Sequence, residues 1–282
     1  MAEITSALVA KLREMTNAGM MDCKKALVET QGSLDAAVDL LRKRGIATAA
    51  KKSAREAREG AVAQCIVPGA RAGVLVEVNC ETDFVAKNEM FRAFCDQVAK
   101  TLVENPATDL EALRTDAVSR IRENIRIARH QRFEVAGNGL VAAYIHTGAK
   151  VGVLAEVGAG KEATVGQGDF KQLVKDITLQ IAAASPVAVT REQIDPAVVA
   201  RERDVLANSD MMKGKPAQAL AKIIEGRLEK FYQTVCLLDQ GFVKRNAEIS
   251  VREHIAGVAK QLADEITVRR FVRFQVGEAL PG

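Results

Sequence analysis

The first 45 residues repeat one pattern of polar and apolar positions three times. Each repeat has a polar residue suited to begin a helix, followed by apolar residues at helical spacing. Thr5, Asp22 and Ser33 are the expected N-caps. Gly32 and Gly45 are expected to end the second and third helices. The pattern therefore predicts a three-helix domain over residues 1–45, just large enough for a small core.

Residues 46–59 are rich in alanine and carry four basic side chains, Lys51, Lys52, Arg55 and Arg58. This composition predicts a solvated, basic helical linker. Glu56 and Glu59 interrupt the positive charge, so an arm that contacts RNA is the less favoured interpretation.

The most informative feature is an internal repeat. Residues 60–91 align with residues 139–170 without a gap, at a constant offset of 79. Chance would give about one identity in ten to fifteen positions at this composition. The identical pairs here include Val62/Val141, Ala63/Ala142, Ile66/Ile145, Gly69/Gly148, Gly73/Gly152, Leu75/Leu154, Glu77/Glu156 and Val78/Val157. Such a density of identities predicts a duplicated structural unit.

Each copy has the pattern of a strand, a glycine-containing turn, a second strand, a loop and a helix. The turns are expected at residues 69–73 and 148–152, because short glycine-containing connections join antiparallel strands. The fold class is therefore α+β, with two repeated ββα subdomains built on small antiparallel sheets. We assign residues 60–138 to the first subdomain and residues 139–282 to the second.

The two copies differ most in the loop between the second strand and the helix, at residues 81–88 and 160–167. Where two scaffolds match and one loop differs, that loop is the place for a separate function. Phe84 stands out there as a large apolar residue in a polar loop. It either contacts a partner or folds back into the core, and the sequence leaves both interpretations open.

Residues 196–235 have the pattern of a helical hairpin inserted into the second subdomain. Pro196 is suited to begin the first helix, and Gly214-Lys215-Pro216 to form the turn. The apolar positions of the second helix are Leu220, Ile223, Ile224, Leu228 and Phe231. Phe271, Val272, Phe274 and Val276 predict a strand after the insertion, so the hairpin must project. It is expected to pair with itself as a coiled coil, or with a second subunit.

Composition limits the class of protein. Of the 282 residues, 4% are aromatic and none is Trp, so the core must be aliphatic. The net charge of +4 is too small to indicate nucleic-acid binding. No secretory signal or apolar run of membrane-spanning length is recognisable. The five cysteines show neither CxxC nor zinc-ligand spacing, which favours reduced thiols in a cytoplasmic protein.

No pattern of catalytic residues is convincing. Residues 158–161 follow a predicted strand, but Ala155 and Glu162 occupy positions where a phosphate loop needs glycine and a hydroxyl. His130, His146 and His254 lie outside the HExxH and GxSxG patterns. We therefore expect a binding module with no cofactor, nucleotide or metal of its own.

Two long segments resemble signatures of the translation elongation factor Ts family, residues 16–27 (TNAGMMDCKKAL) and residues 77–88 (EVNCETDFVAKN). Residues 123–125, 144–146, 224–231 and 271–274 are also similar, whereas residues 243–250 fit only loosely. The resemblance implies a three-helix domain similar to ubiquitin-associated (UBA-like) domains, a two-part core and a projecting coiled-coil hairpin. Some relatives have a helix after the last strand, whereas this chain stops at Gly282.

The resemblance also implies a function and a set of contact residues. The family accelerates GDP release from elongation factor Tu, a GTPase. Thr82, Asp83, Phe84 and Val85 match the segment that disturbs the magnesium site of that partner. The further contacts implied by the resemblance are Met20, Met21, Lys24, Ile125 and His146. For Met20 and Met21, burial within the three-helix core is the alternative.

Two other classes of function remain. The first is an RNA-associated or ubiquitin-like adaptor that uses the three-helix domain and the basic linker. Salt-dependent RNA binding, compared with binding to a nucleotide-bound GTPase, distinguishes it from an exchange factor. The third-ranked class is an enzyme, which would require a bound metal or cofactor.

Overall fold

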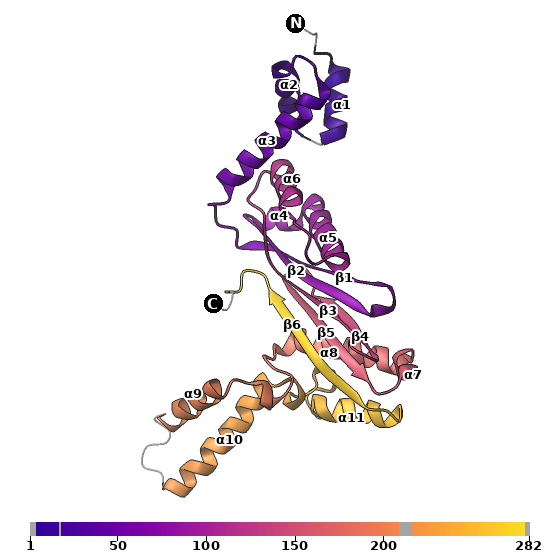
Figure 1. Ribbon diagram of the computed structural model, residues 1–282. Coiled ribbons are helices and arrows are strands. Elements are labelled where there is room, and N and C mark those ends of the chain that lie inside the picture. Colours follow the sequence, from indigo (N-terminus) through magenta and orange to yellow (C-terminus); the bar gives the residue numbers. More distant parts are fainter. Residues whose placement is uncertain (1–3, 17, 209–215, 280–282) are drawn as a thin grey trace.

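Two three-stranded antiparallel sheets form the centre of the molecule, with helices on their outer sides (Figure 1). The computed structural model describes residues 4–16, 18–208 and 216–279. The strand orders are β1-β2-β3 and β4-β5-β6. The predicted α+β class is confirmed.

The N-terminal region is helical, as predicted, with α1 (Ser6–Thr16), α2 (Met20–Glu29) and α3 (Leu34–Lys52). The Thr5 hydroxyl accepts a hydrogen bond from Leu8 N at 3.3 Å, and Ser33 caps α3. The expectation that Asp22 caps α2 is wrong, because the helix begins at Met20 with Gly19 as its N-cap. Leu12 and Leu27 are fully buried in the core that these helices share.

The third helix does not end at Gly45, as the sequence suggested. Gly45 is buried inside α3, and a Cβ atom added there would contact Thr115 and Ser119 of α6 (Glu111–Ile121). Because α3 packs against α6 at this point, the helix continues through Gly45, although a glycine without such packing would favour the end of a helix. The helical part of the predicted linker is therefore the end of α3, which carries the N-terminal helices to the core (Figure 1).

The two core units match element by element. The first contains β1 (Glu59–Ile66), β2 (Ala72–Cys80), α4 (Asp83–Lys87), α5 (Glu89–Glu104), α6 and β3 (Arg126–Glu134). The second contains β4 (Gly139–Ile145), β5 (Val151–Ala159), α7 (Glu162–Val165), α8 (Gly168–Ala184), α11 (Val251–Gln261) and β6 (Ile266–Gln275). Even the irregularity of the middle strand recurs, at Glu77/Val78 and at Glu156/Val157. The sequence repeat missed β3, the third strand of the first sheet.

The sheets pack face to face through equivalent contacts. Arg129 forms an ion pair with buried Glu77 in its own sheet and lies over Phe274 of the other sheet. In the second unit, Arg270 pairs with buried Glu156 and lies over Phe133 of the first sheet. Each sheet thus contributes an arginine that packs on a phenylalanine of the other sheet, and these contacts hold the two sheets together.

The hairpin of α9 (Pro196–Ala207) and α10 (Ala217–Val235) projects from the second unit (Figure 1). Pro196 begins α9 as predicted, and Asp195 is the N-cap. Gly214 and Lys215 of the predicted turn lie outside the described residues. Short 3-10 turns complete the connections, at Pro68–Ala70, Arg191–Gln193, Leu237–Asp239 and Val243–Arg245. Coiled-coil pairing and self-association of this hairpin stay predictions, as does the UBA-like character of the N-terminal helices.

Among the described helices, none combines the length and the apolar character that crossing a membrane requires.

Candidate partner-binding site

The segment Thr82–Val85 lies at the end of β2 and begins a helix of a single turn. Thr82 is the N-cap of α4, and its hydroxyl accepts a hydrogen bond from Val85 N at 3.3 Å. Ala86 is buried beneath the turn, and α5 follows directly. The segment expected to be a loop is therefore a short, anchored helix.

Phe84 points away from the core. Its exposed fraction of 81% is the highest of the large apolar side chains in the described part of the chain. The interpretation that Phe84 folds back as a core anchor is therefore wrong. An exposed aromatic ring on a fixed turn is a feature of contact surfaces rather than of a folded interior.

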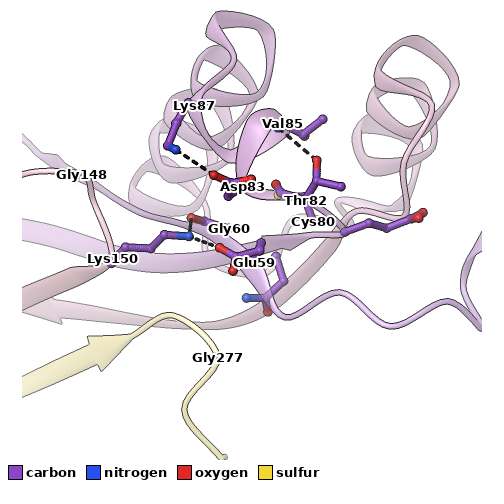
Figure 2. Close-up of polar contacts among 12 residues, drawn as sticks. Glu59, Gly60, Cys80, Thr82, Asp83, Val85, Lys87, Gly148, Lys150 and Gly277 are labelled. Atoms are coloured by element: carbon purple, nitrogen blue, oxygen red, sulfur yellow. Dashed lines mark hydrogen bonds and ion pairs between the residues drawn. The ribbon is translucent and has the colours of Figure 1, made fainter.

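Asp83 carries a stable negative charge next to this ring. Lys87, one helical turn later, donates a hydrogen bond to Asp83 Oδ2 at 2.8 Å and thereby lowers the pKa of the Asp83 carboxyl group. Lys150 approaches from the second unit, where its ammonium contacts the Glu59 carboxylate and the Gly60 carbonyl (Figure 2). The Asp83 carboxylate is half-exposed, and the positive charge of Lys150 also lowers its pKa to a smaller extent.

Thr82 and Val85 are each held by the chain itself, although Thr82 is exposed and Val85 is not. The Thr82 hydroxyl donates a hydrogen bond to Glu123 Oε1 at 2.6 Å, so both of its hydrogen-bonding roles are satisfied within the chain. Val85 is partly buried against the core of the first unit. Of the four predicted residues in this segment, Phe84 has the exposed apolar side chain, and the Asp83 carboxylate beside it is half-exposed.

The hairpin turn of the second unit lies against the first unit. Ala149 O accepts a hydrogen bond from Val62 N at 2.8 Å, and Gly148 O accepts one from the Arg92 guanidinium at 3.0 Å. His146, at the start of this turn, is exposed, with Nδ1 3.1 Å from the Tyr144 hydroxyl. The fold thus brings the turn that carries His146 onto the same unit as α4.

The methionines near the N-terminus are exposed. Met20 and Met21 have exposed fractions of 58% and 63%, so the alternative of burial in the three-helix core is wrong. They occupy the first turn of α2 and, with exposed Lys24, border a depression of about 690 Å³. Flexible methionine side chains form adaptable apolar contact surfaces.

The comparisons with known proteins identify the family. A family model described as Elongation factor TS matches residues 81–278. The chain belongs to the elongation factor Ts family. An Elongation factor Ts from Symbiobacterium thermophilum is 45% identical, over 99% of this chain and 94% of the relative. Elongation factor Ts proteins from Nitratidesulfovibrio vulgaris and Trichlorobacter lovleyi are 40% and 42% identical, each over 98% of this chain and over 96% and 94% of their own length.

Among the further contact residues implied by the elongation factor Ts resemblance, Ile125 is buried, whereas the others are exposed. Its side chain is fully buried in the core of the first unit, and its carbonyl accepts a hydrogen bond from Arg114 at 3.2 Å. Ile125 lies just before β3, and its side chain packs inside the unit that carries α4. It is not an exposed contact residue.

Three residues that were not predicted from the sequence also contribute to the site: Lys87, Lys150 and Glu123. Lys87 could have been found, because side chains four residues apart meet on one helix face. Lys150 and Glu123 could not, because each is brought to the segment from a distant part of the chain. In the described residues no group of three or more His, Cys, Asp and Glu side chains is arranged to hold a metal ion.

Proposed function

We propose that this chain is a guanine nucleotide exchange factor that binds GDP-bound elongation factor Tu and promotes GDP release, so that GTP can rebind. Membership of the elongation factor Ts family supports the general role. The observation that carries the proposal is the exposed Phe84 ring beside the charged Asp83 on a turn anchored at both ends.

The proposed mechanism is a wedge and involves no covalent step. A GTPase holds its nucleotide through phosphate-loop amides, a lysine and Mg²⁺ that bridges phosphate oxygens. Phe84 would enter a cleft between partner helices, where burial of a Phe side chain is worth about 1.5–3 kcal/mol. Asp83 would accept hydrogen bonds from the displaced elements and hold them away from the geometry that coordinates Mg²⁺. No residue of this chain needs to change its protonation state.

Thermodynamic linkage sets a condition on this mechanism. If the factor weakens GDP binding to its partner by some ratio, GDP must weaken binding of the factor by the same ratio. Affinity measured for nucleotide-free and for GDP-bound partner therefore checks the proposed coupling independently of any rate.

The test of function is release of a fluorescent GDP analogue from elongation factor Tu in a stopped-flow instrument. We expect the release rate to rise with the concentration of this chain and then to saturate. No acceleration at any concentration would contradict the proposal. A parallel titration of RNA at two salt concentrations tests the adaptor alternative, because binding through phosphates weakens steeply as salt rises.

Replacing both methionines of α2 tests the second contact surface. We expect Met20→Ala with Met21→Ala to weaken partner binding by roughly tenfold, because two apolar side chains lose their burial in the complex. The melting temperature should stay unchanged, since both side chains are exposed. Val28→Ala is the matched control, because Val28 is 58% exposed near the other end of the same helix. Unchanged affinity with a lower melting temperature would assign the methionines to the fold instead.

A further inference from the structure

The turn that joins α6 to β3 lies beside the start of the exchange segment, Thr82–Val85. In this turn, the carboxylate of Glu123 accepts three hydrogen bonds from the neighbouring chain. Its Oε2 atom accepts from Glu81 N at 2.9 Å and from Thr82 N at 3.1 Å, and its Oε1 atom accepts from the Thr82 hydroxyl at 2.6 Å. Hydrogen bonds to an ionised carboxylate are shorter and stronger than those between neutral groups.

The contact is reciprocal. Glu81 Oε1 accepts a hydrogen bond from Asn124 N at 2.6 Å, so each glutamate binds the backbone of the other segment. Residues 81–82 and 123–124 are thus locked together, although they are more than forty residues apart in the sequence.

The turn itself is held in place. Arg122 has a left-handed φ of 69° and ends α6, with its N–H bonded to Val118 O. Its carbonyl accepts a hydrogen bond from the Lys52 ammonium at the end of α3. Asn124 Nδ2 donates to Arg55 O at 2.7 Å. Because both neighbours of Glu123 are fixed, its carboxylate meets the exchange segment at a defined position.

These bonds reach Asp83 and Phe84 through Thr82. Donation of the Thr82 hydroxyl to Glu123 leaves an oxygen lone pair for Val85 N, the hydrogen bond that begins α4. The α4 helix has only five residues, and so short a helix does not form without outside support. We propose that Glu123 is a positioning residue of the exchange segment, which holds the turn that presents Asp83 and Phe84. This inference rests on the proposed exchange function.

The second unit provides a matched control. Asp264 lies just before β6, as Glu123 lies just before β3, and its Oδ2 atom accepts a hydrogen bond from Lys161 N at 3.0 Å. The two carboxylates thus fix the equivalent segments that precede α4 and α7. The α7 segment, Glu162-Ala163-Thr164-Val165, has no large exposed apolar side chain.

The experiment compares Glu123→Ala, Glu123→Gln and Asp264→Ala with the unchanged chain. GDP release from elongation factor Tu is measured at saturating factor, and amide hydrogen exchange of residues 80–88 and 160–166 is measured on the free chain. We expect Glu123→Ala to lower the saturating rate by about tenfold and to accelerate amide exchange in residues 80–88. Glu123→Gln keeps one acceptor oxygen and should lie in between. Asp264→Ala should accelerate exchange in residues 160–166 and leave the release rate unchanged.

The outcomes separate the two levels of the inference. If the unchanged chain accelerates release and Glu123→Ala matches it at saturation, the positioning role is wrong and the exchange function stands. An equal loss of rate in Glu123→Ala and Asp264→Ala would also overturn it, because the loss would then reflect general destabilisation. If the unchanged chain itself fails to accelerate release, the proposed function is wrong. In that case, amide exchange in residues 80–88 of Glu123→Ala still tests whether Glu123 holds the segment, and unchanged amide exchange would show that it does not.

Discussion

Phe84→Ala is expected to abolish most of the stimulated release of GDP while the fold stays intact. Loss of about 1.5–3 kcal/mol of ring burial in the complex corresponds to a fall in the saturating rate of about tenfold to more than a hundredfold. The fold should not change, because the ring is 81% exposed and has few contacts to lose. Stopped-flow release of a fluorescent GDP analogue gives the rate, and circular dichroism gives the fold.

Asp83→Ala tests the polar half of the same wedge. This variant loses the pair with Lys87, and we expect a marked fall in the rate that becomes larger in excess Mg²⁺, because the proposed role of Asp83 is to keep partner groups from their Mg²⁺-coordinating positions. Val187→Ala is the control for loss of an exposed apolar side chain elsewhere, since Val187 is 70% exposed. Stimulation like that of the unchanged chain in both Phe84→Ala and Asp83→Ala would remove the wedge and leave the N-terminal helices or His146 as the agent.

Features of the fold that depend on local pattern could be predicted from the sequence. The repeat at an offset of 79 located both hairpins, because each strand pair is built from neighbouring residues. The end of α3 was predicted wrongly, since the effect of Gly45 depends on packing against α6. The β3 strand was missed because its basic and polar residues alternate with few apolar ones, and its pairing with β2 is long-range.

For the candidate site too, features set by local pattern could be predicted, and features set by long-range contacts could not. Two interpretations of Phe84 were open from the sequence, because a local pattern does not give the direction of one side chain in a turn. The Asp83–Lys87 pair follows from helical spacing. The hydrogen bonds of Thr82 to Glu123 do not, because a loop of the fold must close before the two residues meet. The residues proposed to act on a partner were thus visible in the sequence, and the residue proposed to position them was not.

The largest effect on stability is expected at two glycines, the second residue of β1 and the first residue of β4. Gly60 and Gly139 have φ values of 150° and 151°, in a region that side-chain-bearing residues rarely adopt. A Cβ atom at Gly60 would lie 2.1 Å from Val78 O, and one at Gly139 would lie 2.5 Å from Val157 O. The obstacle in each case is the backbone of the central strand, which cannot move without breaking its ladder.

We therefore expect Gly60→Ala and Gly139→Ala each to lower the free energy of unfolding by about 3–5 kcal/mol, from backbone strain and overpacking together. Gly226→Ala in α10 is the control. A Cβ atom there meets nothing within 4 Å, and alanine should stabilise the helix by up to about 1 kcal/mol. Urea unfolding followed by circular dichroism measures all three. Stability within about 0.5 kcal/mol of the unchanged chain for Gly60→Ala would show that β1 can shift relative to β2. Such a shift would also move the Gly60 carbonyl, which Lys150 contacts. Because the charge of Lys150 acts on Asp83, a change at Gly60 would then also alter the surroundings of the exchange segment.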